Sequence, residues 1–127
     1  MNDECLRGGD SSRHDLKERT KKFAIRVLRL YAGLPKTTEA QVLGKQVLRS
    51  GTSVGAHYRE ATRARSTAEF VSKIEVGLQE LEETMYWLEL LAEVGIENSG
   101  TIRDTLTEAE ELVRIFVASV RTAKTKR

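Results

Sequence analysis

Apolar residues recur at helical spacing in four segments of the chain, and turn-forming residues separate these segments. Residues 15–33, 39–63, 67–94 and 101–123 each place apolar side chains at i, i+3 or i+4, and i+7, the spacing of one helix face. The third segment is the most regular, with Phe70, Ile74, Leu78, Leu81, Met85, Leu88 and Leu91 in one stripe. No alternating pattern of the kind that a strand shows is present. The pattern therefore predicts an all-α protein.

The same periodicity predicts the core faces of the other three helices. The expected core residues are Phe23, Val27, Leu30 and Leu34 in the first, Val42, Leu43, Val47, Val54, Tyr58 and Ala61 in the second, and Ile102, Leu106, Ala109, Val113, Phe116, Val117 and Val120 in the fourth. Leu28 and Tyr31 lie beside the first stripe.

Helix start and stop signals divide the four segments. Gly33 and Pro35 end the first helix, and Thr37-Thr38 caps the second. Residues 66–69, Ser-Thr-Ala-Glu, form a capping box that opens the third helix, which Gly95 ends. Because helices joined by short loops pack as antiparallel neighbours, we predict an up-down-up-down four-helix bundle over 15–123. Residues 1–14 are expected to be a flexible polar tail, and 124–127 a basic tail.

The second helix is unusually rich in small residues between Gly44 and Ala56. Each glycine inside a helix costs about 1 kcal/mol relative to alanine, so such a run indicates that another backbone approaches closely. Charged residues flank the run, and we hypothesise that Arg49 and Glu60 are partly buried and fix helix register or subunit contacts. The expected structural or interface residues are Arg49, Ser50, Gly51, Ser53, Gly55, His57 and Glu60.

Composition and motifs argue against several classes of protein. The 127 residues suit one domain, and the lone Cys5 cannot form an internal disulfide, which favours a reducing compartment. No apolar run approaches the ~20 residues that span a bilayer, and the N-terminus is too polar for a signal peptide. We therefore expect a cytoplasmic protein without a membrane partner.

Catalytic and metal-binding patterns are not found in the sequence. Neither His14 nor His57 follows a glutamate by three residues, as the di-iron bundles require, and there is no cysteine cluster. His57 has no obvious serine partner outside its own helix, and no phosphate-binding glycine loop is present. We expect no cofactor, no metal and no enzymatic activity.

Charge is unevenly distributed along the chain. Residues 1–66 carry 14 lysines and arginines against 7 acidic residues, whereas 67–127 carry 7 against 12. One interpretation is charge matching within or between subunits; the other is a basic face for nucleic acid. The candidate nucleic-acid-binding residues are Lys17, Lys21, Lys22, Arg26, Arg29, Arg59, Arg63, Arg65, Lys124, Lys126 and Arg127. No aromatic platform or recognition-helix signature accompanies them.

The stretch from Leu48 to Leu91 resembles the four-helix-bundle family encoded in intervening sequences of 23S ribosomal RNA genes. It is also similar to the accessory variability protein of diversity-generating retroelements. The matching residues are Arg49-Ser50, Ser53-Val54, Glu60-Ala61, Ser66, Glu69-Phe70, Glu82-Glu83 and Tyr86-Trp87. His57 departs from the pattern, since asparagine is usual at this position. The resemblance covers about residues 16–122.

This resemblance implies a homopentamer with a positively charged surface and a role connected with nucleic acid. Accessory variability proteins bind a reverse transcriptase and its template RNA. We therefore expect a non-enzymatic oligomer that binds RNA or DNA through basic residues, with a reverse transcriptase as a candidate second partner. The alternative is an oligomeric protein-interaction scaffold with no direct nucleic-acid role.

Overall fold

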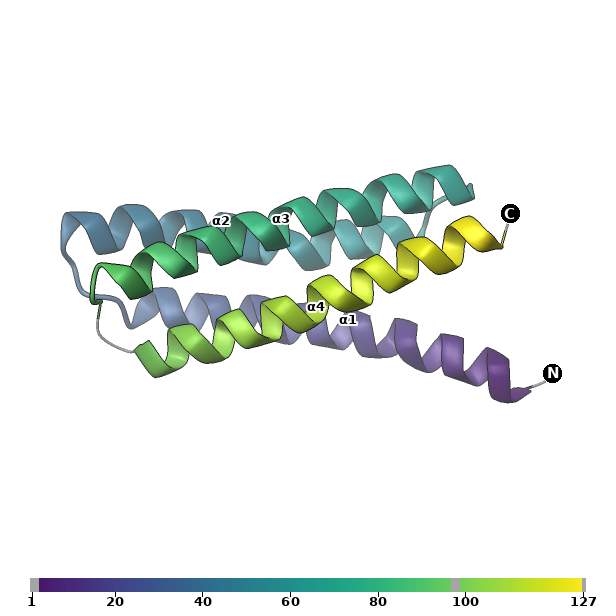
Figure 1. The fold of residues 1–127 in the computed structure, drawn as a ribbon, viewed down its shortest axis with the longest axis horizontal. Helices are drawn as coiled ribbons and strands as arrows, with labels where there is room; N and C mark the ends of the chain where they lie inside the picture. The colour runs from purple at the N-terminus through teal and green to yellow at the C-terminus, as the bar shows by residue number, and fades with distance from the viewer. Residues whose placement is uncertain (1–2, 97–98, 127) are drawn as a thin grey trace.

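Four long helices make up the chain, and consecutive helices run in opposite directions (Figure 1). The computed structural model describes residues 3–96 and 99–126, with side chains from residue 16 onwards except at Ser99. The helices are α1 (Asp3–Ala32), α2 (Thr38–Thr62), α3 (Thr67–Glu93) and α4 (Ser99–Thr125). The predicted all-α, up-down-up-down bundle is confirmed.

The helices pack in a ring in which each helix contacts two others. Contacts join α1 to α2, α2 to α3, α3 to α4 and, less extensively, α4 back to α1. Consequently α1 and α3 lie diagonally opposite each other, with α2 and α4 between them. The beginning of α1, the α2–α3 turn and the end of α4 lie at the same end of the bundle (Figure 1).

The predicted signals at the helix ends account for most of the boundaries. The Thr37 side chain accepts a hydrogen bond from the Ala40 N–H at 3.3 Å, and the Ser66 hydroxyl accepts one from the Glu69 N–H at 3.1 Å. In return, the Glu69 carboxylate accepts the N–H of Arg65, the residue before the cap, at 3.0 Å. Gly95 adopts a left-handed conformation with φ of 77° just after α3 ends.

The boundaries of α1 and α4 differ from the prediction. The α1 backbone is already helical at Asp3, twelve residues before the expected start, so the predicted tail over 1–14 is helical over most of its length. No proline interrupts 3–14, and one end of a helix can extend into solvent without losing its internal hydrogen bonds. At the other terminus, α4 continues to Thr125, into the predicted basic tail.

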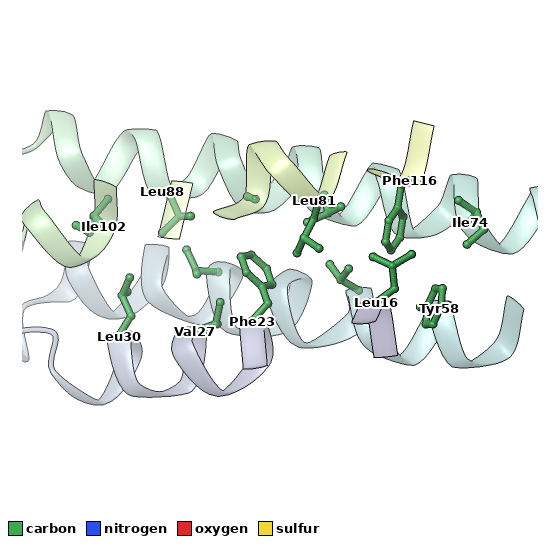
Figure 2. Close-up of a cluster of buried hydrophobic side chains, with 14 of the residues drawn as sticks. Leu16, Phe23, Val27, Leu30, Tyr58, Ile74, Leu81, Leu88, Ile102 and Phe116 are labelled. Atoms are coloured by element: carbon green, nitrogen blue, oxygen red, sulfur yellow. The ribbon is translucent and has the colours of Figure 1, made fainter. Parts of the chain in front are cut away.

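Side chains from all four helices fill one continuous core (Figure 2). Its largest fully buried members include Phe23, Tyr58 and Phe116, and the Tyr58 and Phe116 rings lie 6.1 Å apart. One predicted core position was wrong, because Val42 is 55% exposed, and Leu28, which was expected beside the first stripe, is 49% exposed. Both lie at the edge of an apolar stripe, where a small rotation of the helix decides between core and solvent.

Four hydroxyl-bearing residues are buried in this core, which the apolar pattern did not predict: Thr20, Ser50, Thr84 and Thr105. Each hydroxyl donates a hydrogen bond of 2.7–2.9 Å to the carbonyl oxygen four residues earlier, so each buried hydroxyl has a partner within its own helix. The Ser50 and Thr84 hydroxyls also lie 2.7 Å apart, which joins α2 to α3 inside the core.

Candidate nucleic-acid interface

The basic residues of α1 lie on its solvent-exposed side. Core residues Leu16, Phe23, Val27 and Leu30 fix the rotation of the helix, and Lys17, Lys21, Lys22, Arg26 and Arg29 are all exposed as a result. Among the described residues, none of these five cations forms an ion pair. Their charge is therefore available to a ligand.

Three of these cations border a groove between α1 and the beginning of α4. Lys22, Arg26 and Arg29 follow each other at i, i+4 and i+7, and they line the groove together with Ile25, Leu30 and Thr101. At 1.5 Å per residue, this row of cations extends about 10 Å along the helix, close to three nucleotide steps of 3.4 Å. We call Lys22, Arg26 and Arg29 the groove cations.

A second group of candidates gathers at one end of the bundle. Arg59 lies in the last turn of α2, while Arg63 and Arg65 lie in the turn before α3. Lys124 and Lys126 lie at the end of α4, which reaches the same end of the molecule (Figure 1). All five are exposed, and we call this group the basic end. The fold thus brings together two clusters that are about 60 positions apart in sequence, whereas Arg127 lies outside the described residues.

Among the basic residues of α1 whose side chains the structure describes, Arg19 pairs with α4 instead of facing solvent unpaired. Its guanidinium donates to Glu108 with Nε–Oε2 at 3.1 Å and Nη2–Oε1 at 2.9 Å, and Nη2 also reaches Glu111 Oε1 at 2.8 Å. This bidentate contact holds α1 against α4, the pair of neighbouring helices that packs least extensively. It also neutralises two carboxylates that border the α1–α4 junction.

The small residues of α2 lie where this helix packs closely against α1 on one side and against α3 on the other. A methyl group added at Gly51 would lie 2.8 Å from Val27 Cγ2, and one added at Gly55 would lie 3.2 Å from Thr20 Oγ1. Ser50 faces α3 instead, through Thr84, and the Ser53 hydroxyl donates to the Arg49 carbonyl at 2.8 Å. These residues contribute to packing within one chain.

Arg49 ties α2 to α3 at the surface. Its guanidinium donates a short hydrogen bond to Glu83, and its Nη1 lies 3.7 Å from Glu80 Oε1. This contact raises the pKa of Arg49. The pKa of Glu83 is lowered, first by the hydrogen bond from Arg49 and next by the one that Trp87 Nε1 donates at 3.3 Å.

His57 and Glu60 continue this line of charges toward the α2–α3 turn. His57 Nε2 lies 3.7 Å from Glu80 Oε2, and its Nδ1 lies 3.5 Å from Glu60 Oε1. Lys73 Nζ approaches the same Glu60 oxygen to 3.2 Å, and the pKa of Glu60 is lowered by Lys73 first and by His57 second. The Arg49 and Glu60 side chains are 53% and 51% exposed, so they are less buried than hypothesised.

Sequence reasoning did not identify the partners of these charges. The glutamates that recur every seven residues, Glu75, Glu82 and Glu89, are exposed and form no ion pair with a described residue. The partners are Glu80 and Glu83, which lie on the α2 side of α3. The sequence carried no signal for these two partners, because the burial of Thr84 between them and α2 was itself not predicted and the meeting sides of two helices depend on the rotation of both.

The described residues contain no cluster of histidine, cysteine or carboxylate side chains that could hold a metal ion. In the same part of the chain, no helix combines the length and apolar character that crossing a bilayer requires.

The fold and these surfaces define an antiparallel four-helix bundle with a basic α1 and a basic end. The sequence profile of the 23S rRNA-intervening sequence protein family matches residues 13–118, and the chain belongs to this family. It is also similar to a crystal structure from Bacteroides thetaiotaomicron, of a protein with unknown function from the S23 ribosomal protein family. That similarity has a TM-score of 0.80 at 34% sequence identity and covers 87% of this chain and 98% of the other. None of the curated proteins matches the chain.

Proposed function

We propose that this chain is a non-enzymatic, self-associating cytoplasmic protein that binds RNA or DNA through its basic residues. The observation that carries the proposal is the set of exposed lysines and arginines on α1 and at the basic end, none of which is paired with a described acidic residue. When such a cation neutralises a phosphate, counterions condensed on the nucleic acid are released. This release supplies most of the affinity in sequence-independent binding.

The character of the surface supports contact with the nucleic-acid backbone. Among described residues, the exposed side of α1 carries cations and aliphatic side chains but no exposed aromatic residue on which an unpaired base would stack. Backbone contacts position a protein on nucleic acid without reading its sequence. Affinity should therefore depend strongly on salt and weakly on sequence.

Binding measured across a salt series tests this function. A fluorescent RNA hairpin and a DNA duplex of equal length are titrated with the protein between 50 and 300 mM salt. We expect saturable binding at 50 mM that weakens steeply, with a linear slope of log affinity against log salt. Absence of binding to both ligands at 50 mM would overturn the proposal.

A pentameric assembly and an accessory role beside a reverse transcriptase belong to the same proposal, and both are supported by the resemblance to accessory variability proteins. The mass of the assembly in light scattering tests the first. Copurification with a reverse transcriptase encoded in the same genomic neighbourhood tests the second. If the protein assembles and copurifies but binds no nucleic acid, the protein-interaction scaffold is the function. Exposed Tyr86 and Val94 on and beside α3 favour that second candidate.

A further inference from the structure

Opposite faces of the bundle carry opposite charge. The exposed positions of α1 between residues 17 and 29 hold five cations and one acid, Glu18. The exposed positions of α3 hold five glutamates, Glu69, Glu75, Glu82, Glu89 and Glu93, and no lysine or arginine. Because α1 and α3 lie diagonally across the bundle, these charges cannot neutralise each other within one chain.

Each of these faces contains a continuous stripe at helical spacing. On α1 the stripe is Lys17, Lys21, Ile25 and Leu28, at i, i+4, i+8 and i+11, beside the groove cations. On α3 it is Glu75, Gln79, Glu82, Tyr86, Glu89 and Glu93, at i, i+4, i+7, i+11, i+14 and i+18. We call these the α1 stripe and the α3 stripe.

The large apolar residues that the bundle leaves exposed are concentrated in the same places. Ile25 and Leu28, 37% and 49% exposed, lie in the α1 stripe. Tyr86, 54% exposed, lies in the α3 stripe, and Val94, also 54% exposed, follows the end of α3. Val42, near the beginning of α2, completes the set of large hydrophobic residues that are exposed in the described chain. Single exposed apolar residues are ordinary, but here they are set among charges of one sign on each face.

We propose that the α1 stripe of one copy of this chain packs against the α3 stripe of a second copy. Lysines then meet glutamates, while Ile25 and Leu28 meet Tyr86, so charge and apolar surface are both matched. Packing of α1 on α1, or of α3 on α3, would bring like charges together. A second copy of the chain is therefore the proposed partner, because it carries the stripe that is complementary in charge and in apolar surface.

This contact joins two different surfaces, so it is heterologous. Each copy offers one α1 stripe and one α3 stripe on opposite sides, and each added copy leaves both kinds of surface open until the assembly closes into a ring. The groove cations lie on the α4 side of the α1 stripe and stay accessible in such an assembly, whereas Lys17 and Lys21 then belong to the subunit contact and not to the nucleic-acid surface. The inference rests on the self-association in the proposed function and adds the surfaces that make it.

Two complementary charge-reversal variants test the pairing. One carries Lys17→Glu and Lys21→Glu, and the other carries Glu82→Lys and Glu89→Lys. Masses are measured by sedimentation at about 50 mM salt, where exposed charges are weakly screened. We expect the wild type to assemble, each variant alone to fall to the mass of one chain, and an equimolar mixture of the two to assemble again. Recovery in the mixture follows because each variant complements the other at both surfaces. The two variants must then alternate, so a closed ring of the mixture holds an even number of copies and not the five of the proposed pentamer.

Matched controls separate this pairing from general effects of charge. Arg103→Glu with Arg114→Glu, and Asp104→Lys with Glu110→Lys, reverse two exposed charges on α4 and should leave the assembly intact. Circular dichroism confirms that each variant is folded. A monomeric wild type, an assembled single variant or a monomeric mixture would each overturn the inference.

RNA binding by the Glu82→Lys, Glu89→Lys variant distinguishes this inference from the proposed function. Binding by the monomeric variant that is lost when the groove cations are also changed to glutamine supports the assignment of the two activities to separate surfaces, because such binding does not come from the two added lysines. If the wild type binds RNA as a monomer, the pairing is wrong and nucleic-acid binding stands. If the wild type assembles through the two stripes but binds no RNA, the pairing stands and nucleic-acid binding is wrong.

Discussion

Single small residues set how closely the helices of this bundle approach. At Gly51, the hydrogen in place of a methyl group leaves room for Val27, which is completely buried and, being β-branched, has little rotamer freedom. The sequence indicated a close approach somewhere along α2, because glycine is costly inside a helix. It did not indicate which glycine faces which neighbour, because that depends on the rotation of two helices about their axes.

We expect Gly51→Ala to destabilise the protein, although alanine is the better helix former. The added methyl group would lie 2.8 Å from Val27 Cγ2, and overpacking of this kind costs about 1–3 kcal/mol, against about 1 kcal/mol gained in helix propensity. Urea denaturation measures the net loss. Combining Gly51→Ala with Val27→Ala removes the clash, so the two effects should not add.

Gly100→Ala is the matched control for this substitution. Gly100 is exposed in the first turn of α4, and a methyl group there would meet nothing within 4 Å. The variant should be as stable as the wild type or more stable, by up to about 1 kcal/mol. Equal effects at Gly51 and Gly100 would show that close packing does not explain Gly51.

The pairing of Arg49 with Glu83 makes part of the stability depend on pH. Because the pKa of Glu83 is lowered in the folded protein, its contribution is present above the unfolded pKa and is lost as pH falls through the folded pKa. At neutral pH we expect Arg49→Met to cost about 0.2–1 kcal/mol, the usual range for an exposed pair. The difference from wild type should shrink as the pH is lowered from 6 toward about 3, around the ordinary glutamate pKa of about 4.3.

Chemical denaturation of both proteins at each pH measures this difference. Glu75→Gln, which removes an exposed glutamate that has no described partner, is the control and should show no such convergence. A cost of Arg49→Met that stays constant down to pH 3 would mean that the lost packing of the arginine side chain, and not its charge, is responsible.

At the scale of the helix, the ends that carry local signals were predicted and those without them were not. Thr37 and Ser66 cap α2 and α3 as expected, since a cap depends only on residues three positions apart. The beginning of α1 has no such signal, and its predicted start was twelve residues too late. Likewise, the partners of Arg49 depend on which sides of α2 and α3 meet, which no local pattern determines.

The Ser66 cap should contribute measurably to the stability of the bundle. Ser66→Ala removes the acceptor of the Glu69 N–H, and losing such a cap costs about 1 kcal/mol. Amide hydrogen exchange at Glu69 should become faster, and urea denaturation should show the loss. Ser72→Ala, at an exposed position inside α3, is the control and should be neutral or slightly stabilising. A cost that is the same at both positions would contradict the role of the cap.

At the scale of the whole molecule, the fold decides which of the sequence-predicted cations act together. The sequence indicated a basic first half, and α1 carries eight of its 14 lysines and arginines. Only the bundle places Arg59, Arg63 and Arg65 at the same end of the molecule as the end of α4 (Figure 1). Likewise, only the bundle forms the groove between α1 and α4 that Lys22, Arg26 and Arg29 line. Arg19 looks equivalent to its basic neighbours in the sequence, but in the bundle it forms ion pairs with Glu108 and Glu111.

Neutralising the groove cations should therefore reduce nucleic-acid binding more than neutralising an equal number of charges elsewhere. We compare Lys22→Gln, Arg26→Gln, Arg29→Gln with the same change at Arg103, Arg114 and Arg121, three exposed arginines of α4. If each groove cation contacts one phosphate, the salt slope for a DNA duplex should fall by about 2.7, since each contact contributes about 0.9. The α4 triple variant should leave the slope nearly unchanged. Equal losses in both variants would mean that net charge alone attracts the ligand, and that the groove between α1 and α4 is not where it binds.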